Sequence, residues 1–240
     1  MQWFIGLSSY YNFRWQEIFY PVDIPRKQWF DYYVTRFNSF ELNSTFYAMP
    51  HLKTMQNWYD KAPDGFKFSA KVPKTVTHIK LFNDTRETMD EFYGVLRDGL
   101  REKLGCVLFQ LPPRLVYSDQ LLDSIIANTN PAFTNAIEFR NATWWNKKIQ
   151  DQLAEHNIVF CGVSYPKLPD DVIINSSTNY YRLHGVPKLY YEQYDDAFIE
   201  NLGKTISKGK KVKEAYVYFN NTASAAAIHN ALHLKEVLNE

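Results

Sequence analysis

Short apolar runs alternate along this chain with longer segments in which apolar residues recur every three or four positions. The short runs have the length and alternation of β-strands. They predict eight strands, over residues 4–9, 39–46, 66–72, 106–112, 136–141, 159–164, 180–185 and 215–221.

The intervening segments have the spacing of amphipathic helices. They predict helices over residues 26–37, 51–62, 85–104, 118–129, 146–157, 195–208 and 224–240. Residues 165–179 show no helical pattern and are expected to form a long loop. Alternation of strand and helix requires parallel pairing, and eight such strands in 240 residues favour a (β/α)8 TIM-type barrel. We expect an α/β fold with residues 1–240 forming a single domain.

One set of alternate residues in each strand must be apolar to face the surrounding helices, which turns the other set toward the barrel axis. In the fifth strand, Ile137 and Phe139 face the helices, so Glu138 and Arg140 face the axis. The same argument turns polar residues of six strands inward: Glu41, Asn43, Lys71, Gln110, Glu138, Arg140, Arg182, His184 and Asn220.

Most of these polar residues lie toward the carboxyl ends of their strands, where this fold builds its sites. A buried charge without a partner costs several kcal/mol, so these groups must pair or bind a ligand. An ion-pair network that only fills the barrel, such as Glu138 with Arg182 and Glu41 with Lys71, is the structural alternative. Ordinary barrel interiors are filled mainly by branched aliphatic side chains, which favours function for the whole set.

Composition bears on the partners and the cellular location that we expect for the protein. The formal net charge of +1 gives no overall electrostatic signature for nucleic acid or an anionic membrane. No apolar run approaches the roughly 20 residues of a membrane span. The first residues, MQWFIGLSS, lead directly into a predicted strand, so we expect no secretion signal. Cys106 and Cys161 lie in apolar runs, which favours reduced thiols and a cytoplasmic protein.

The strings at the strand ends resemble the successive signatures of the YecE-like family, domain of unknown function 72. They are IGLSSYYNFRWQEIFYP, FELNSTFYAMP, KVPKTVTH, LFQLPP, IEFRNATW, YYRLHG and YVYFNNT. The resemblance runs from the first strand to the last helix. It implies a TIM-type barrel and a set of site positions, but it names no reaction.

Carried onto this sequence, the family motifs imply the following site residues: Glu41, Asn43, Lys71, His78, Gln110, Glu138, Arg140, Arg182, His184, Asn220 and Asn221. The chain departs from the pattern twice, with Asn141 where the family usually has His and Ser164 where it usually has Asp. Both departures remove potential metal ligands or proton carriers. We therefore expect no metal and no other cofactor.

The segment after the first strand is rich in aromatic residues, including Tyr10. Such a segment can stack on a sugar or base. Equally, it can be a hydrophobic cover that closes the barrel mouth. The stretch from Asn220 through Thr222 leads into a helix that begins SAAA. Its amino terminus can attract an anion, or Thr222 or Ser224 can simply cap it.

The first functional hypothesis is an enzyme acting on a small anionic molecule, phosphorylated or sugar-like, by acid–base chemistry. Lys71, Arg140 and Arg182 are expected to converge and to make the mouth electropositive, with binding contacts from His78, Asn43, Gln110, Asn220, Asn221 and Tyr10. Glu138 or Glu41 would act as the base and His184 or His78 as an acid–base partner. Lys71 is a further catalytic candidate, because neighbouring cations lower the pKa of a lysine toward Schiff-base chemistry.

Two alternatives remain open. One is a nucleic-acid-processing enzyme like the barrel-fold endonucleases. It is less favoured, because such enzymes need a cluster of metal ligands and the mouth supplies only two Glu and two His. The other is a non-catalytic binding module for an acidic ligand. The sequence specifies neither the substrate nor the oligomeric state.

Overall fold

The computed structural model describes residues 1–239. Its strands form one sheet, and every pairing recorded between strands is parallel. The order is β6-β5-β4-β3-β2-β1-β9-β8-β7. The strands are β1 (Gln2–Leu7), β2 (Ser39–Leu42), β3 (Lys67–Lys71), β4 (Leu104–Gln110), β5 (Thr134–Glu138), β6 (Ile158–Phe160), β7 (Gly162–Ser164), β8 (Thr178–Leu183) and β9 (Glu214–Phe219).

One predicted strand is divided in two. Residues 159–164 were expected to form a continuous strand, but β6 ends at Phe160 and β7 begins at Gly162. The reason is a change of partner, since β6 pairs with β5 and β7 pairs with β8. The strands β6 and β7, which stand at the two ends of this order, are therefore halves of a single predicted strand. With these halves counted together, the eight predicted strands occur in the order of a TIM-type α/β barrel, and this fold class is confirmed.

The chain is organised in two compact units. Unit 1 comprises Met1–Glu41 and Gly162–Glu240, and unit 2 comprises Leu42–Cys161. Both boundaries fall within predicted strands.

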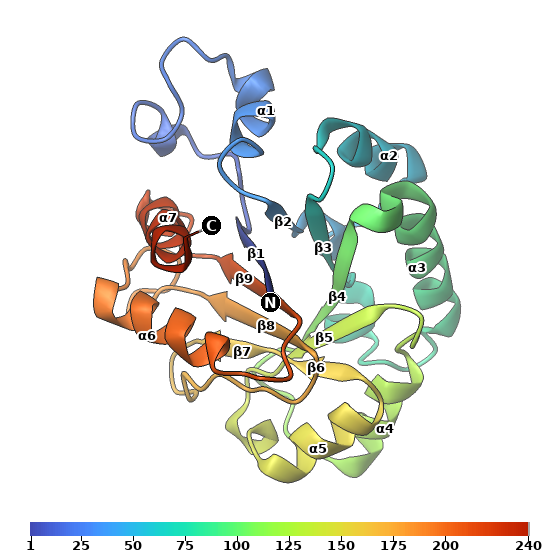
Figure 1. The fold of residues 1–240 in the computed structure, drawn as a ribbon. Helices are drawn as coiled ribbons and strands as arrows, with labels where there is room; N and C mark the ends of the chain where they lie inside the picture. Colours follow the sequence, from blue (N-terminus) through green and yellow to red (C-terminus); the bar gives the residue numbers. More distant parts are fainter. Residues whose placement is uncertain (240) are drawn as a thin grey trace. The chain divides into compact units, whose positions relative to one another are not determined.

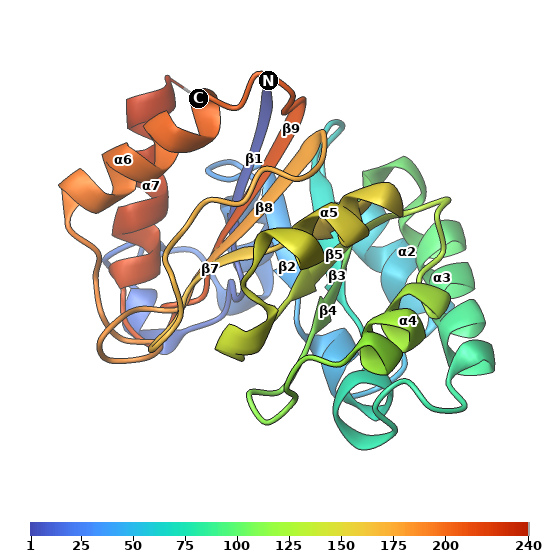
Figure 2. The ribbon, with the colours of Figure 1, turned by 90° about the horizontal axis from the view of Figure 1, so that it is seen from below.

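In unit 1 (Figure 1), α7 (Ala226–Leu238) packs on β1 and β9, and α6 (Asp196–Ser207) packs on α7. Figure 2 shows these two helices side by side. The short helix α1 (Trp29–Tyr33) follows the aromatic segment after β1. Residues 165–177 contain no helix or strand, as expected for the predicted loop.

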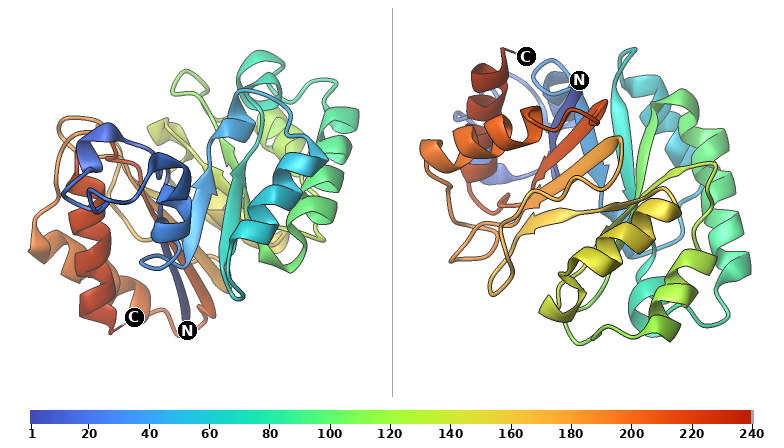
Figure 3. Two further views of the ribbon diagram at one scale, coloured as in Figure 1. Left: turned by 90° about the horizontal axis from the view of Figure 1, so that it is seen from above. Right: turned by 60° about the horizontal axis from the view of Figure 1, so that its bottom comes forward.

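In unit 2, α2 (Leu52–Lys61) packs against α3 (Arg86–Leu100), as Figure 3 shows. The remaining helices are α4 (Asp119–Ala127) and α5 (Lys147–Glu155). Two short turns follow β2 and β3, the strands that carry the predicted site residues Glu41 and Lys71. They are η3 (Ser44–Phe46) after β2 and the π-helical turn η4 (Thr75–Ile79) after β3. Such π-helical turns are frequent at functional sites.

Side-chain caps explain where several helices begin. The side chains of Ser118, Asn146 and Asp195 each accept a hydrogen bond from the backbone N–H three residues later. These bonds satisfy amide groups that the first helical turn leaves without a partner. In residues 1–239, no helix is both long and apolar enough to span a membrane.

Candidate functional site

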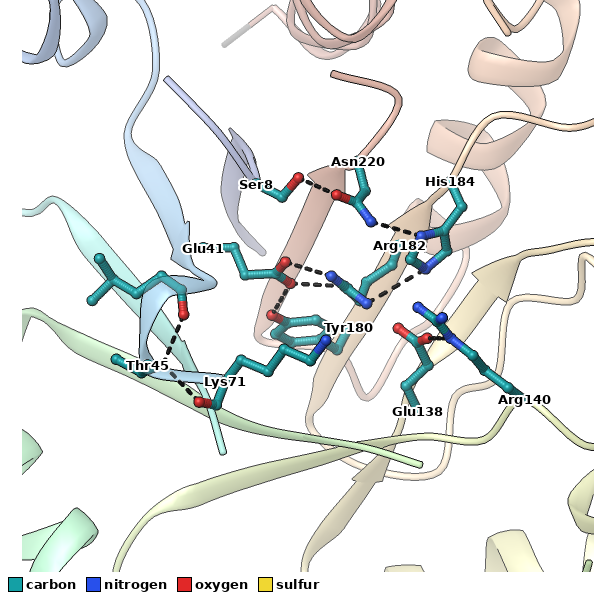
Figure 4. Close-up of polar contacts among 11 residues, drawn as sticks. Ser8, Glu41, Thr45, Lys71, Glu138, Arg140, Tyr180, Arg182, His184 and Asn220 are labelled. Carbon is teal, nitrogen blue, oxygen red and sulfur yellow. Dashed lines mark hydrogen bonds and ion pairs between the residues drawn. The ribbon is translucent and has the colours of Figure 1, made fainter. Parts of the chain in front are cut away.

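Unit 1 holds a buried ion pair between Glu41 on β2 and Arg182 on β8 (Figure 4). Arg182 Nη2 donates to Glu41 Oε2 at 2.6 Å and Arg182 Nε donates to Oε1 at 2.8 Å. The hydroxyl of Tyr180 also donates to Oε1, at 2.8 Å. Glu41 and Arg182 have only 0% and 1% of their surface exposed. The pairing confirms that alternate residues of β8 share a face with Glu41.

A second chain of polar contacts in unit 1 ends at His184. The Ser8 hydroxyl donates to Asn220 Oδ1, and Asn220 Nδ2 lies 2.8 Å from His184 Nδ1. The other ring nitrogen, Nε2, lies 3.4 Å from Arg182 Nη1. We call these six residues the β8 cluster: Ser8, Glu41, Tyr180, Arg182, His184 and Asn220. Because both oxygens of Glu41 accept bonds from Arg182, His184 is the better candidate proton carrier of this cluster.

Unit 2 gathers positive charge at the carboxyl ends of β3, β4 and β5. Lys71 is the last residue of β3, and its Nζ lies 3.9 Å from the centre of the Phe46 ring. Arg140 follows β5, and its Nε donates to Glu138 Oε1 at 2.5 Å. Arg114 follows β4, and its Nη2 donates to the His78 carbonyl oxygen at 2.8 Å. We call Lys71, His78, Arg114, Glu138 and Arg140 the cation cluster.

The nearby positive charges affect the pKa of His78. The pKa is lowered to about 4, first by burial and then by the cations Lys71, Arg140 and Arg114, in that order. His78 is therefore neutral at pH 7. The Thr77 hydroxyl lies 2.8 Å from its Nδ1, and its ring lies edge-on to Phe46 at 5.0 Å, so its orientation is fixed. The cluster therefore combines this imidazole with three basic side chains and one carboxyl side chain.

Similarity to known proteins gives the same family as the strand-end motifs. The family model described as "Protein of unknown function DUF72" matches residues 4–240. This chain belongs to the DUF72 family. It is 21% identical to the UPF0759 protein YunF of Bacillus subtilis (strain 168), over 98% of this chain and 94% of that protein. It is 27% identical to the UPF0759 protein YecE of Escherichia coli (strain K12), over 55% of this chain and 48% of that protein.

Solved structures give the same assignment. A DUF72 family protein from Thermotoga maritima superposes over 100% of both chains with a TM-score of 0.90 and 26% identity. One from Enterococcus faecalis V583 superposes with a TM-score of 0.86 at 19% identity, over 100% of this chain and 96% of that one, and shares the fold.

The residues implied by the DUF72 motifs fall into both units. Lys71, His78, Glu138 and Arg140 are brought together in unit 2, and Glu41, Arg182, His184 and Asn220 in unit 1. Gln110 pairs with Glu138 in the sheet register, and its Nε2 donates to the Leu111 carbonyl at 2.6 Å. Asn43 is the residue that precedes the turn η3. The convergence expected for Arg182 with Lys71 and Arg140 stays a prediction.

Asn221 and Tyr10 lie in unit 1 but are not members of the β8 cluster. Asn221 is fully buried, and its Nδ2 donates to the Glu192 carbonyl and to Asn230 Oδ1. Tyr10 packs edge-on against Phe30 and Phe40 and accepts, through its carbonyl, a bond from the Tyr20 hydroxyl. Burial raises the pKa of Tyr10. The ring contacts of Tyr10 agree with the hydrophobic-cover alternative. The binding roles of Asn221 and Tyr10 stay predictions.

Side-chain hydrogen bonds join the segment after β1 to the segment after β9. Asn12 Nδ2 donates to the Thr222 carbonyl and Trp15 Nε1 to the Ser224 carbonyl, each at 2.7 Å. The Ser224 hydroxyl accepts from the Ala226 amide at 3.3 Å, but the N-cap position of α7 is Ala225, which makes no side-chain cap bond. Capping by Thr222 or Ser224 and anion binding at this terminus both stay predictions.

Sequence reasoning missed Ser8, Arg114 and Tyr180. Tyr180 has the same parity in β8 as Arg182, so the alternation alone could have found it. Arg114 directly follows LPP at the end of β4, but its bond to the His78 carbonyl depends on the tertiary structure. No metal-binding group of three or more His, Cys, Asp or Glu side chains occurs within residues 1–239.

Proposed function

We propose that this chain is an enzyme acting on a small anionic molecule, phosphorylated or sugar-like, by acid–base chemistry at the cation cluster. The single observation that carries the proposal is the pKa of His78, lowered to about 4 by burial and three surrounding cations. Burial disfavours any added charge, but the field of the three cations, which disfavours an added proton, should favour an added anion. Carboxyl ends of parallel strands are also where barrel enzymes bind their substrates.

Each residue has a chemical role in this proposal. Lys71, Arg114 and Arg140 bind the anion through charge-assisted hydrogen bonds. Glu138 is the general base, since its carboxylate is fully buried and oriented by Arg140 at 2.5 Å. His78, neutral at pH 7, hydrogen-bonds the substrate and can exchange a proton with it. We also place the protein in the cytoplasm, because both cysteines are buried thiols rather than half-cystines.

Calorimetric titration with inorganic phosphate and sugar phosphates tests the binding step. Arg114→Ala should weaken binding by about 1.5–3 kcal/mol, the range for a hydrogen bond to a charged group. Arg97→Ala is the matched control, because Arg97 is an exposed arginine of the same unit that pairs with Asp98. Equal affinity in wild type and Arg114→Ala, or no binding by wild type at millimolar ligand, would reject the site.

The catalytic step needs a separate measurement. Proton NMR in D2O should show turnover of a bound sugar phosphate, or exchange of its carbon-bound hydrogens with solvent. Glu138→Gln should abolish this without weakening phosphate binding, because the amide preserves the shape of the side chain but removes its basicity and its negative charge. Binding without turnover or exchange would instead assign a non-catalytic binding module.

A further inference from the structure

Three large apolar side chains are exposed on consecutive loops of unit 2. Tyr47 is 71% exposed, Ile79 is 65% exposed and Val116 is 58% exposed. These residues follow β2, β3 and β4, and the last two loops also carry His78 and Arg114 of the cation cluster. Exposed apolar side chains on the loops of a polar site are commonly covered when a ligand binds.

The Phe46 ring connects Tyr47 with two members of the cation cluster. Lys71 Nζ lies 3.9 Å from the ring centre, and the His78 ring lies 5.0 Å away. Tyr47 packs edge-on to the same ring at 5.2 Å. Tyr47 is therefore one ring away from two members of the cation cluster. A further cation, Lys74, lies 5.7 Å from the centre of the Tyr47 ring.

These loops are held in place by their own hydrogen bonds. The Thr45 hydroxyl makes bonds of 2.9 Å to the Leu42 carbonyl and 2.6 Å to the Lys71 carbonyl, which ties η3 to the end of β3. Arg114 ties the loop after β4 to the π-helical turn η4 through the His78 carbonyl. A surface that is already ordered loses little conformational entropy when a ligand binds.

We propose that the ligand of the cation cluster is an aromatic phosphate monoester whose ring stacks on Tyr47. This inference rests on the proposed anion site and adds the substrate class. Its phosphate contacts Lys71, Arg114 and Arg140, and its ring covers Tyr47 with Lys74 beside it. Nucleotides and simple aryl phosphates share this chemistry. Tyr47 supplies a large, flat and accessible surface, and stacking on such a surface is selective for planar groups.

Calorimetry with four probes separates the contributions of phosphate, sugar and ring. The probes are inorganic phosphate, ribose 5-phosphate, phenyl phosphate and adenosine 5′-monophosphate. Phenyl phosphate and the nucleotide should each bind about tenfold more tightly than ribose 5-phosphate, which corresponds to one stacked ring. Tyr47→Ala should abolish this tenfold gain and leave the affinity for inorganic phosphate unchanged, whereas Tyr47→Phe should keep the gain.

Tyr191→Ala is the matched control, because Tyr191 is also exposed and has Lys188 Nζ 4.9 Å from its ring centre. It should leave all four affinities unchanged. Equal binding of ribose 5-phosphate and the aromatic probes would overturn this inference and leave the proposed anion site standing. No binding of any probe would overturn both. Tighter binding of the nucleotide than of phenyl phosphate would assign the nucleotide, and equal binding would assign the ring alone.

Discussion

Arg182 and Glu41 were both expected at the site, and their side chains meet as a bidentate pair that is almost completely buried. A charge in such surroundings is tolerated only while its partner is present. The positive charge of Arg182 is therefore compensated within unit 1 by Glu41. This is why we assign anion binding to Lys71, Arg114 and Arg140, the basic side chains that influence His78 in unit 2.

Breaking this pair should destabilise the protein strongly. Glu41→Gln leaves the Arg182 guanidinium without its counter-charge, and we expect a loss of about 3–5 kcal/mol in the free energy of unfolding. The double variant Glu41→Gln with Arg182→Met should recover part of this loss, because neither charge remains. Urea denaturation gives these values. The exposed pair of Arg86 and Asp90 is the control, and Arg86→Ala should cost less than about 1 kcal/mol. A similarly small loss in Glu41→Gln would contradict the argument.

The His78 imidazole should report the charge around it. Its pKa in the folded protein is about 4, below the ordinary 6.5. NMR titration should show the His78 resonance, assigned with His78→Gln, changing near pH 4. Lys71→Met should raise this pKa more than Arg114→Ala does, because Lys71 is the strongest of the three cationic influences. A His78 that titrates near 6.5 in the wild type would remove the basis of the anion site.

The sign of the linked stability change follows from the same pKa values. Between pH 6.5 and about 4, the unfolded state binds a proton at His78 that the folded state does not. His78 therefore lowers stability as the pH falls through this window, and has no such effect above it. His78→Gln should make unfolding less sensitive to acid between pH 6.5 and 4, as measured by urea midpoints at several pH values.

At the scale of elements, the approach of β1 to β2 depends on Gly6. A Cβ atom at Gly6 would lie 2.0 Å from the Ser39 carbonyl oxygen, which is backbone and cannot move aside easily. Gly6 is also the register partner of Ser39. A glycine inside a strand often marks such a close approach of two backbones.

Two glycine substitutions should therefore have opposite effects. Gly6→Ala should destabilise the protein by about 3 kcal/mol or more, because β1 and β2 must separate to admit the methyl group. Gly94 lies within α3, and apart from its chain neighbours and the backbone of its own helix no atom lies within 4 Å of the position a Cβ would occupy. Gly94→Ala should instead stabilise the protein by about 1 kcal/mol, since alanine is the better helix former. Thermal unfolding of both variants measures the difference. Equal effects would show that the close approach at Gly6 is unimportant.

At the scale of the whole molecule, the hydrophobic pattern was sufficient for the fold class and for the order of the elements. It also gave the parity that joins Glu41 with Arg182, because one face of each strand must be apolar. It could not reveal the interruption at Cys161, since apolar residues continue through that position while the pairing partner changes. The place of Arg114 in the cation cluster could not be predicted, because its bond to the His78 carbonyl joins two loops and produces no periodic pattern in the sequence.

The distribution of charge leads to a prediction about metals. Glu41 is held by Arg182 in unit 1 and Glu138 by Arg140 in unit 2, so each carboxylate lies against a guanidinium that repels a cation. We expect protein washed with chelator to contain less than stoichiometric transition metal in elemental analysis. Stoichiometric zinc or manganese would contradict this and favour the nucleic-acid-processing alternative.

The burial of both cysteines makes them natural chemical reporters. Cys106 lies within β4 and Cys161 between β6 and β7, and each is 0% exposed. A thiol reagent can therefore react with either residue only after the surrounding sheet has opened. The rate of labelling, followed as reagent concentration rises, should give the opening rate of each strand region without any engineered probe. Because one thiol belongs to an uninterrupted strand and the other to the interruption, mass spectrometry of the two labelled peptides would show whether the sheet opens first where its pairing changes.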